Sequence, residues 1–170
     1  MPASLFGFPN PVNEVAARAV AGGVLVLSVL TLVLSIAFGP GWLWLTLVLA
    51  SGFVARVLTG PTLSPLGQLA TRVIAPRVGP AKFVAGPPKR FAQAMGATMS
   101  ITAAILHFGF GLDTAALVFV ALIIVAATLE SVFAFCLGCT VFAGLMRVGL
   151  IPEATCAACA NITLREPQSA

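Results

Sequence analysis

Charged side chains are what this sequence most lacks. Only 8% of its 170 residues are Asp, Glu, Lys or Arg, which is about a third of the share in a soluble globular domain. Hydrophobic residues make up 59% of the chain, and the mean hydropathy is +1.08. Too few polar side chains remain to cover a surface that faces water. The composition therefore excludes an ordinary cytosolic fold and predicts a protein covered by lipid.

Four apolar segments are long enough to cross the hydrocarbon core of a bilayer, which takes about 20 residues in a helix. The predicted spans are residues 15–38, 42–58, 92–108 and 114–136. The breaks at 39–41 and 109–111 are so short that spans one and two, and spans three and four, must be antiparallel neighbours. The first apolar run is too long for a signal peptide and has no basic segment before it, so we expect a retained helix.

The sequence thus predicts an all-α, polytopic membrane protein. Its single domain, 1–170, consists of four transmembrane helices arranged as two antiparallel hairpins. A basic connection, 59–91, joins the two hairpins, and a cysteine-containing tail, 148–170, follows the last span.

Neither predicted hairpin turn contains Lys or Arg. Basic residues gather instead in or beside the central connection, at Arg56, Arg72, Arg77, Lys82, Lys89 and Arg90. The positive-inside rule places this connection in the cytoplasm, and an even number of spans places both termini there too. Arg18, Arg147 and Arg165 fit the same orientation. We expect a multi-pass protein of the inner (cytoplasmic) membrane, with its cysteines at the cytoplasmic side.

Within the connection, apolar residues recur at helical spacing after a capping serine, Ser64, until Pro76. They are Leu66, Leu69, Ala70, Val73 and Ile74. This pattern predicts a short amphipathic helix that lies on the membrane.

The basic residues beside this segment are candidates to contact anionic lipid headgroups, each contact contributing about 1 kcal/mol. These candidates are Arg72, Arg77, Lys82, Lys89 and Arg90. A phosphorylated ligand at 86–90 is an alternative, although topology alone explains the cluster. Binding of nucleic acid is not expected, because the charge is modest and no base-stacking platform accompanies it.

Glu130 is the one charged residue inside the fourth predicted span. An acid at that depth costs about 2.5 kcal/mol or more unless it is protonated or paired, so it should face the interior of the bundle. Arg56, Ser51 and Gln93 lie at comparable depth and are its candidate partners. Two interpretations remain open: a proton relay or ligand to a cation or cofactor, and a buried polar anchor that fixes helix packing.

The third span carries small residues at steps of four, Gly96, Ser100 and Ala104. Such residues let a neighbouring helix approach closely, and packing explains them completely. Met95 and Met99 are likewise packing residues rather than copper ligands, because no His or Cys lies within one turn.

All four cysteines occur in two CxxC pairs, Cys136 with Cys139 and Cys156 with Cys159. The overall spacing, C-x2-C-x16-C-x2-C, lies in the range of zinc ribbons, so four thiolates could hold a structural zinc ion. A permanent disulfide is not expected in the reducing cytoplasm. The remaining interpretations are a dithiol that exchanges with a partner or carries sulfur as a persulfide, and inert apolar cysteines.

Position along the helix bears on these interpretations, which all stay open. At the C-terminal end of a long helix, the dipole opposes ionisation of Cys136. A break near Gly138 would instead place Cys139 at the start of a new segment that runs to about Gly149. We therefore predict an interruption near Gly138, with Cys136 and Cys139 reduced at rest and close enough to form a reversible disulfide.

Several motifs resemble those of a family of small bacterial integral-membrane proteins known only as a domain of unknown function. They are Asn13, Glu14 and Arg18; Ser64–Gly67 (SPLG); Gly86–Gln93 (GPPKRFAQ); and Leu129–Glu130 followed by Cys136–Cys139 (CLGC). The resemblance covers nearly the whole chain and implies a four-helix membrane protein. It also implies partners of the thioredoxin-like or sulfurtransferase type, and it assigns no catalytic residue.

Two functional classes follow from these observations. In the first, the protein is a membrane thiol-redox or sulfur-handling component, in which Cys136 and Cys139 exchange, Cys156 and Cys159 relay, and Glu130 moves protons. In the second, it is a non-catalytic accessory or scaffold subunit in a homo- or hetero-oligomer, and its cysteines bind zinc.

Overall fold

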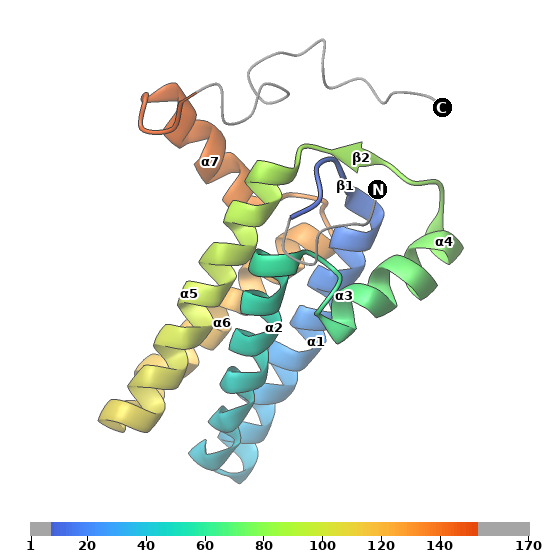
Figure 1. Ribbon diagram of the computed structural model, residues 1–170. Coiled ribbons are helices and arrows are strands. Elements are labelled where there is room, and N and C mark those ends of the chain that lie inside the picture. Colours follow the sequence, from blue (N-terminus) through green and yellow to red (C-terminus); the bar gives the residue numbers. More distant parts are fainter. Residues whose placement is uncertain (1–7, 153–170) are drawn as a thin grey trace.

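The computed structural model describes residues 8–152, and helices dominate it (Figure 1). Four helical segments are long and apolar enough to cross a membrane. They are α1 (Glu14–Phe38), the segment Pro40–Thr59 formed by the 3-10 helix η1 (Pro40–Trp44) and α2 (Leu45–Thr59), α5 (Gly86–Phe110) and α6 (Asp113–Ser131). The four long apolar helices expected from the sequence are therefore confirmed.

The four long helices form one bundle in which α1 packs against α6, α2 packs against α5, and α5 packs against α6. Their shared core contains Val24, Phe53, Ala97 and Ile123, one residue from each helix. Many large apolar side chains point outward instead, and Ile36 is 70% exposed. An apolar exterior of this kind is what a lipid environment requires.

The two ends of the bundle differ in charge. At one end, η1 and the turn at Gly111 join successive helices, and this turn end carries no Lys or Arg within the described residues. The other end holds the connection between α2 and α5, and we call it the basic end. Its basic residues are Arg18, Arg56, Arg72, Arg77, Lys82, Lys89, Arg90 and Arg147.

Two short strands close the basic end. β1 (Val12–Asn13) pairs antiparallel with β2 (Phe83–Val84), so that the chain before α1 lies beside the chain before α5. The Asn13 side chain caps α1 by accepting a hydrogen bond from the Val15 backbone N–H at 3.0 Å. An ion pair between Lys82 and Glu14, 2.9 Å apart, adds a surface contact between the same two segments.

The connection between α2 and α5 forms three helical segments that follow one another without a break from Pro65 to Val78. They are α3 (Pro65–Leu69), the π-helical η2 (Ala70–Ile74) and α4 (Ala75–Val78). Ser64 caps α3 as expected, accepting from the Gly67 N–H at 3.2 Å. Pro76 does not end the helix, because the wider π turn before it accommodates a residue that cannot donate a backbone hydrogen bond.

The fourth long helix ends at Ser131, before the predicted boundary at Cys136. The chain leaves the helix at 132–136 and re-enters α7 (Leu137–Arg147). Arg18 of α1 donates to the carbonyl oxygens of Ser131 and Val132 at 3.1 and 3.4 Å, so a cation binds the C-terminal end of α6. Gly138 lies inside α7. The expected interruption near Gly138 is present, but it lies at 132–136, just before the glycine rather than at it.

Candidate functional site

The first cysteine pair lies where α7 begins. Cys136 is the N-cap of α7, and its sulfur accepts a hydrogen bond from the Cys139 backbone N–H at 3.2 Å. The Cα atoms are 5.2 Å apart, and the two sulfur atoms form a disulfide. Both cysteines are partly exposed. The helix break thus places Cys136 at the N-terminus of α7. In an uninterrupted helix it would instead lie near the C-terminal end.

A close contact holds this turn against the bundle. Gly138, between the two cysteines, packs on α5 so tightly that a Cβ atom there would lie 2.6 Å from Ala92 Cα. Farther along α7, Phe142 packs against Phe91 of α5, with ring centroids 5.7 Å apart. The disulfide is therefore fixed beside the first turns of α5.

A buried ion pair lies at the same end of the bundle. The Lys89 Nζ atom on α5 is 2.7 Å from Glu130 Oε1 on α6, and the two side chains are 9% and 13% exposed. The partners predicted for Glu130, which were Arg56, Ser51 and Gln93, are not the ones it contacts. Lys89, expected among lipid headgroups, instead lies buried, because α5 begins at Gly86 rather than at residue 92 and carries Lys89 into the bundle.

A second polar contact lies one turn further along α5. Arg56 of α2 donates from Nε to Gln93 Oε1 at 2.8 Å and from a terminal nitrogen to Ser64 Oγ at 3.2 Å. Its guanidinium also lies 4.7 Å from the centre of the Phe53 ring. Lys89 and Gln93 are four residues apart on α5, so they lie on one face of the helix. Together, the two contacts connect α2, α5 and α6 through buried polar groups.

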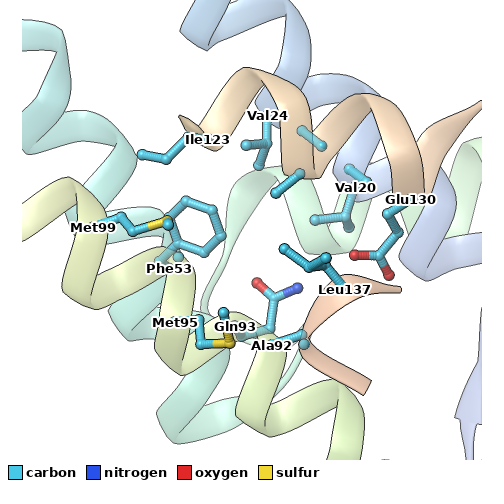
Figure 2. A pocket seen from close by; sticks show the side chains of 15 residues that line it. Val20, Val24, Phe53, Ala92, Gln93, Met95, Met99, Ile123, Glu130 and Leu137 are labelled. Atoms are coloured by element: carbon cyan, nitrogen blue, oxygen red, sulfur yellow. The ribbon is translucent and has the colours of Figure 1, made fainter. Parts of the chain in front are cut away.

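A cavity of about 70 Å³ lies among the four long helices and reaches α7 (Figure 2). Its wall is mostly apolar and includes Phe53 and Met99, while Gln93 and Glu130 supply polar groups. Leu137 and Gly138, the two residues between the cysteines, also line it. One water needs roughly 10–15 Å³ of such space together with polar partners. The cavity therefore has room for water between the Glu130 carboxyl group and the turn that carries the disulfide.

The other predicted site residues are distributed over the basic end. Arg72 is exposed, Lys82 pairs with Glu14, and Arg77 donates to the carbonyl oxygen of Val73 in its own helix at 2.8 Å. Arg90 reaches α2 and donates to the Val57 carbonyl oxygen at 3.0 Å. None of these four residues belongs to the cavity beside Glu130.

The second predicted cysteine pair, Cys156 and Cys159, lies outside the described residues. Within residues 8–152 the structure groups no three His, Cys, Asp or Glu side chains in a way that could hold a metal ion. Far from the cysteines, at the turn end, His107 Nδ1 is 2.6 Å from Asp113 Oδ1.

Sequence reasoning missed the pairing of Lys89 with Glu130. A signal for it was present, because prolines favour the first turn of a helix and Pro87 and Pro88 occupy the first turn of α5. That start places Lys89 on the same helix face as Gln93. The missed role of Arg18 has no comparable local signal, since its acceptors are more than a hundred residues away in the chain.

The model of one protein family, described as a domain of unknown function (DUF4395), matches residues 12–147. The chain belongs to the DUF4395 family. No curated protein and no solved structure matches it. The DUF4395 match begins at β1 and ends with α7, so it contains the four long helices, the ion pair and the Cys136–Cys139 disulfide, while Cys156 and Cys159 lie beyond it. The expected resemblance to a domain of unknown function is thereby confirmed.

Proposed function

We propose that this DUF4395 protein is an integral membrane component that exchanges thiols and disulfides through Cys136 and Cys139. The observation that carries the proposal is the position of Cys136 as the N-cap of α7, where its sulfur accepts the Cys139 N–H. A helix N-terminus favours the negatively charged thiolate, which is the reactive form of cysteine. Partial exposure leaves the pair open to a partner.

In the reduced protein, the Cys136 thiolate attacks one sulfur of a disulfide on a thioredoxin-like partner. A mixed disulfide forms and the partner's other sulfur leaves as a thiolate. Cys139 then loses its proton and attacks the Cys136 sulfur, which breaks the mixed disulfide and closes the Cys136–Cys139 bond. Two electrons pass to the partner, whose two sulfurs take up the two protons. The reverse sequence reduces the pair.

The same thiolate is suited to sulfur transfer. Attack by Cys136 on the outer sulfur of a persulfide breaks the sulfur–sulfur bond of the donor, which leaves as a thiolate. Cys136 then carries the persulfide, and no outside oxidant or reductant is required. A sulfurtransferase is the partner class for this variant of the reaction.

Glu130 is the proposed proton carrier for the pair. Its carboxyl group lines the cavity that Leu137 and Gly138 also line, and water in that space would connect it to the base of the CxxC turn. Lys89 holds the Glu130 carboxylate in position. Acidic residues inside membrane helices are functional by default, and this one combines a fixed partner with a cavity.

The alternative, an accessory subunit with a structural zinc site, requires four thiolates. Such a site would need Cys136 and Cys139 reduced and Cys156 and Cys159, which lie outside the described residues, brought beside them. We also propose that the basic end faces the cytoplasm and that the protein resides in the inner membrane, since the charge difference between the two ends follows the positive-inside rule.

Single-cysteine variants test the proposed exchange. We would purify the chain with Cys156→Ser and Cys159→Ser, then compare Cys139→Ser with Cys136→Ser after reduction. Using 5,5′-dithiobis(2-nitrobenzoic acid) as the disulfide probe, we expect Cys139→Ser, which retains Cys136, to form its mixed disulfide at least ten times faster. Adding Cys139 back should expel the bound thiolate by closing the pair.

Equal and slow reaction of both variants would contradict exchange at this turn. Zinc content measured on the four-cysteine protein provides the second criterion. One zinc ion per chain, released only as all four thiols become reactive, would establish the structural site instead.

A further inference from the structure

A second hollow lies on the outside of the bundle, where α5, α7 and the chain before α1 meet. Its volume is about 430 Å³, which is within the ~300–1,000 Å³ range of small-molecule sites. Its lining is apolar and aromatic, apart from Arg90 and Asn10, and it includes Pro9, Val57, Phe91 and Phe142. This groove is separate from the cavity beside Glu130.

The groove lies where the membrane-crossing helices end. Val57 is in the last turns of α2, and Gly86 and Pro87 begin α5. Lipid phosphate groups lie at this level, just outside the hydrocarbon core. Exposed apolar side chains are next in the chain to residues of the groove: Leu58 follows Val57, and Val141 precedes Phe142.

Arg90 gives the groove one fixed cation. The Val57 carbonyl oxygen would normally accept the backbone N–H four residues later in the helix, but that residue is Pro61, which has none. Arg90 Nε takes this place, donating to the oxygen at 3.0 Å. Among the described residues, the two terminal nitrogens of Arg90 have no acceptor, and the side chain is exposed.

We propose that this groove binds one acidic phospholipid, with its phosphate on the terminal nitrogens of Arg90 and an acyl chain along Phe91 and Phe142. Charge complementarity supports an anionic headgroup, since Arg90 belongs to the basic end and none of the described residues that line the groove is acidic. Basic pockets between membrane helices recognise such headgroups. Because Phe91 is on α5 and Phe142 is on α7, the lipid would bridge the helix that carries the disulfide to the bundle.

The test measures lipid retention on the full chain by native mass spectrometry. The protein would be exchanged into a mild detergent containing equal amounts of dioleoyl phosphatidylglycerol and dioleoyl phosphatidylcholine. We expect one retained phosphatidylglycerol per chain and about fivefold weaker retention in Arg90→Gln, the effect of one headgroup contact. Arg72→Gln removes the same charge from an exposed position outside the groove, and it should retain lipid as the unmodified chain does.

Ala94→Trp provides a variant that keeps every charge. Ala94 lines the groove, so an indole there should fill it and displace the lipid without removing Arg90. Equal losses in Arg90→Gln and Arg72→Gln would indicate only diffuse attraction and overturn the site. Equal retention of the two lipids, no loss in Ala94→Trp, or full displacement by millimolar inorganic phosphate would also overturn it.

Discussion

Lys89 Nζ lies 2.7 Å from Glu130 Oε1, which joins the beginning of α5 to the end of α6 inside the bundle. Placing two charges in an apolar environment is costly, and their attraction offsets this cost only while both are present. The pair therefore contributes little net stability compared with apolar side chains of similar size. Losing one partner, however, leaves an uncompensated charge.

The first prediction follows from this asymmetry. We expect Lys89→Met to lower the free energy of unfolding by about 3–5 kcal/mol, and Lys89→Met/Glu130→Met to recover most of that loss. Unfolding of the purified protein in detergent by added denaturant would measure both. Lys82→Met is the matched control, because Lys82 pairs with Glu14 at the surface and its side chain is 71% exposed. That variant should change stability by less than about 1 kcal/mol. A double variant as unstable as the single one would show that the two residues do not act as a pair.

The second prediction concerns the contact that fixes the disulfide. Gly138→Ala would bring a Cβ atom to 2.6 Å from Ala92 Cα, so α7 must move away from α5. We expect this to cost about 1–3 kcal/mol, the usual effect of overpacking, and to speed reduction of the Cys136–Cys139 disulfide by dithiothreitol. Gly144→Ala lies on the same helix where a Cβ atom meets nothing within 4 Å, and it should behave as the unmodified chain. Identical reduction rates for the two variants would contradict the packing argument.

Hydropathy could predict the four long helices, because the signal adds up over about 20 residues and lipid allows few other structures. It could not predict where α6 ends. Residues 132–135 are as apolar as the helix before them, and the cation that binds the last carbonyls is Arg18 on α1. A helix end that depends on a distant side chain cannot be predicted from the residues around it.

The candidate site, too, could be predicted from the sequence only in part. The spacing of Cys136 and Cys139 predicts their proximity, because residues three apart in a turn have Cα atoms at a distance that a disulfide tolerates. The burial of Glu130 follows from its charge within an apolar segment. Its partner depends on which face α5 turns toward the other helices, and that orientation is fixed in part by packing such as Gly96 of α5 against Phe53 of α2. Such contacts between helices cannot be predicted from a single sequence.

The third prediction tests the proposed orientation. In a variant lacking native cysteines, Ala81→Cys would report on the connection between α2 and α5, and Gly41→Cys on η1. Both positions are exposed, and a side chain at Gly41 meets no other atom within 4 Å. With a membrane-impermeant maleimide on intact cells, we expect label at Gly41→Cys alone, and label at both sites after permeabilisation. The reverse pattern on intact cells would place the basic end outside.

The last prediction separates a proton-carrying Glu130 from a purely structural one. Glu130→Gln keeps the shape of the side chain and an oxygen that can accept from Lys89, so we expect the fold to be retained, with a lower free energy of unfolding because Lys89 is left without an opposite charge. It removes the ability to take up a proton. If Glu130 receives the Cys139 proton during closure, the rate at which the mixed disulfide on Cys136 resolves should fall about 10²-fold, the lower range for a lost general base. Stopped-flow measurement of thiolate release would give the rate of resolution, and thermal unfolding of the same sample would give its stability.

The control variant is Glu14→Gln, which removes an acid that pairs with exposed Lys82. It should leave the rate of mixed-disulfide resolution unchanged. Glu130→Asp should restore part of the rate. An unchanged rate in Glu130→Gln, measured on protein that is still folded, would leave Glu130 a packing residue and remove it from the proposed chemistry.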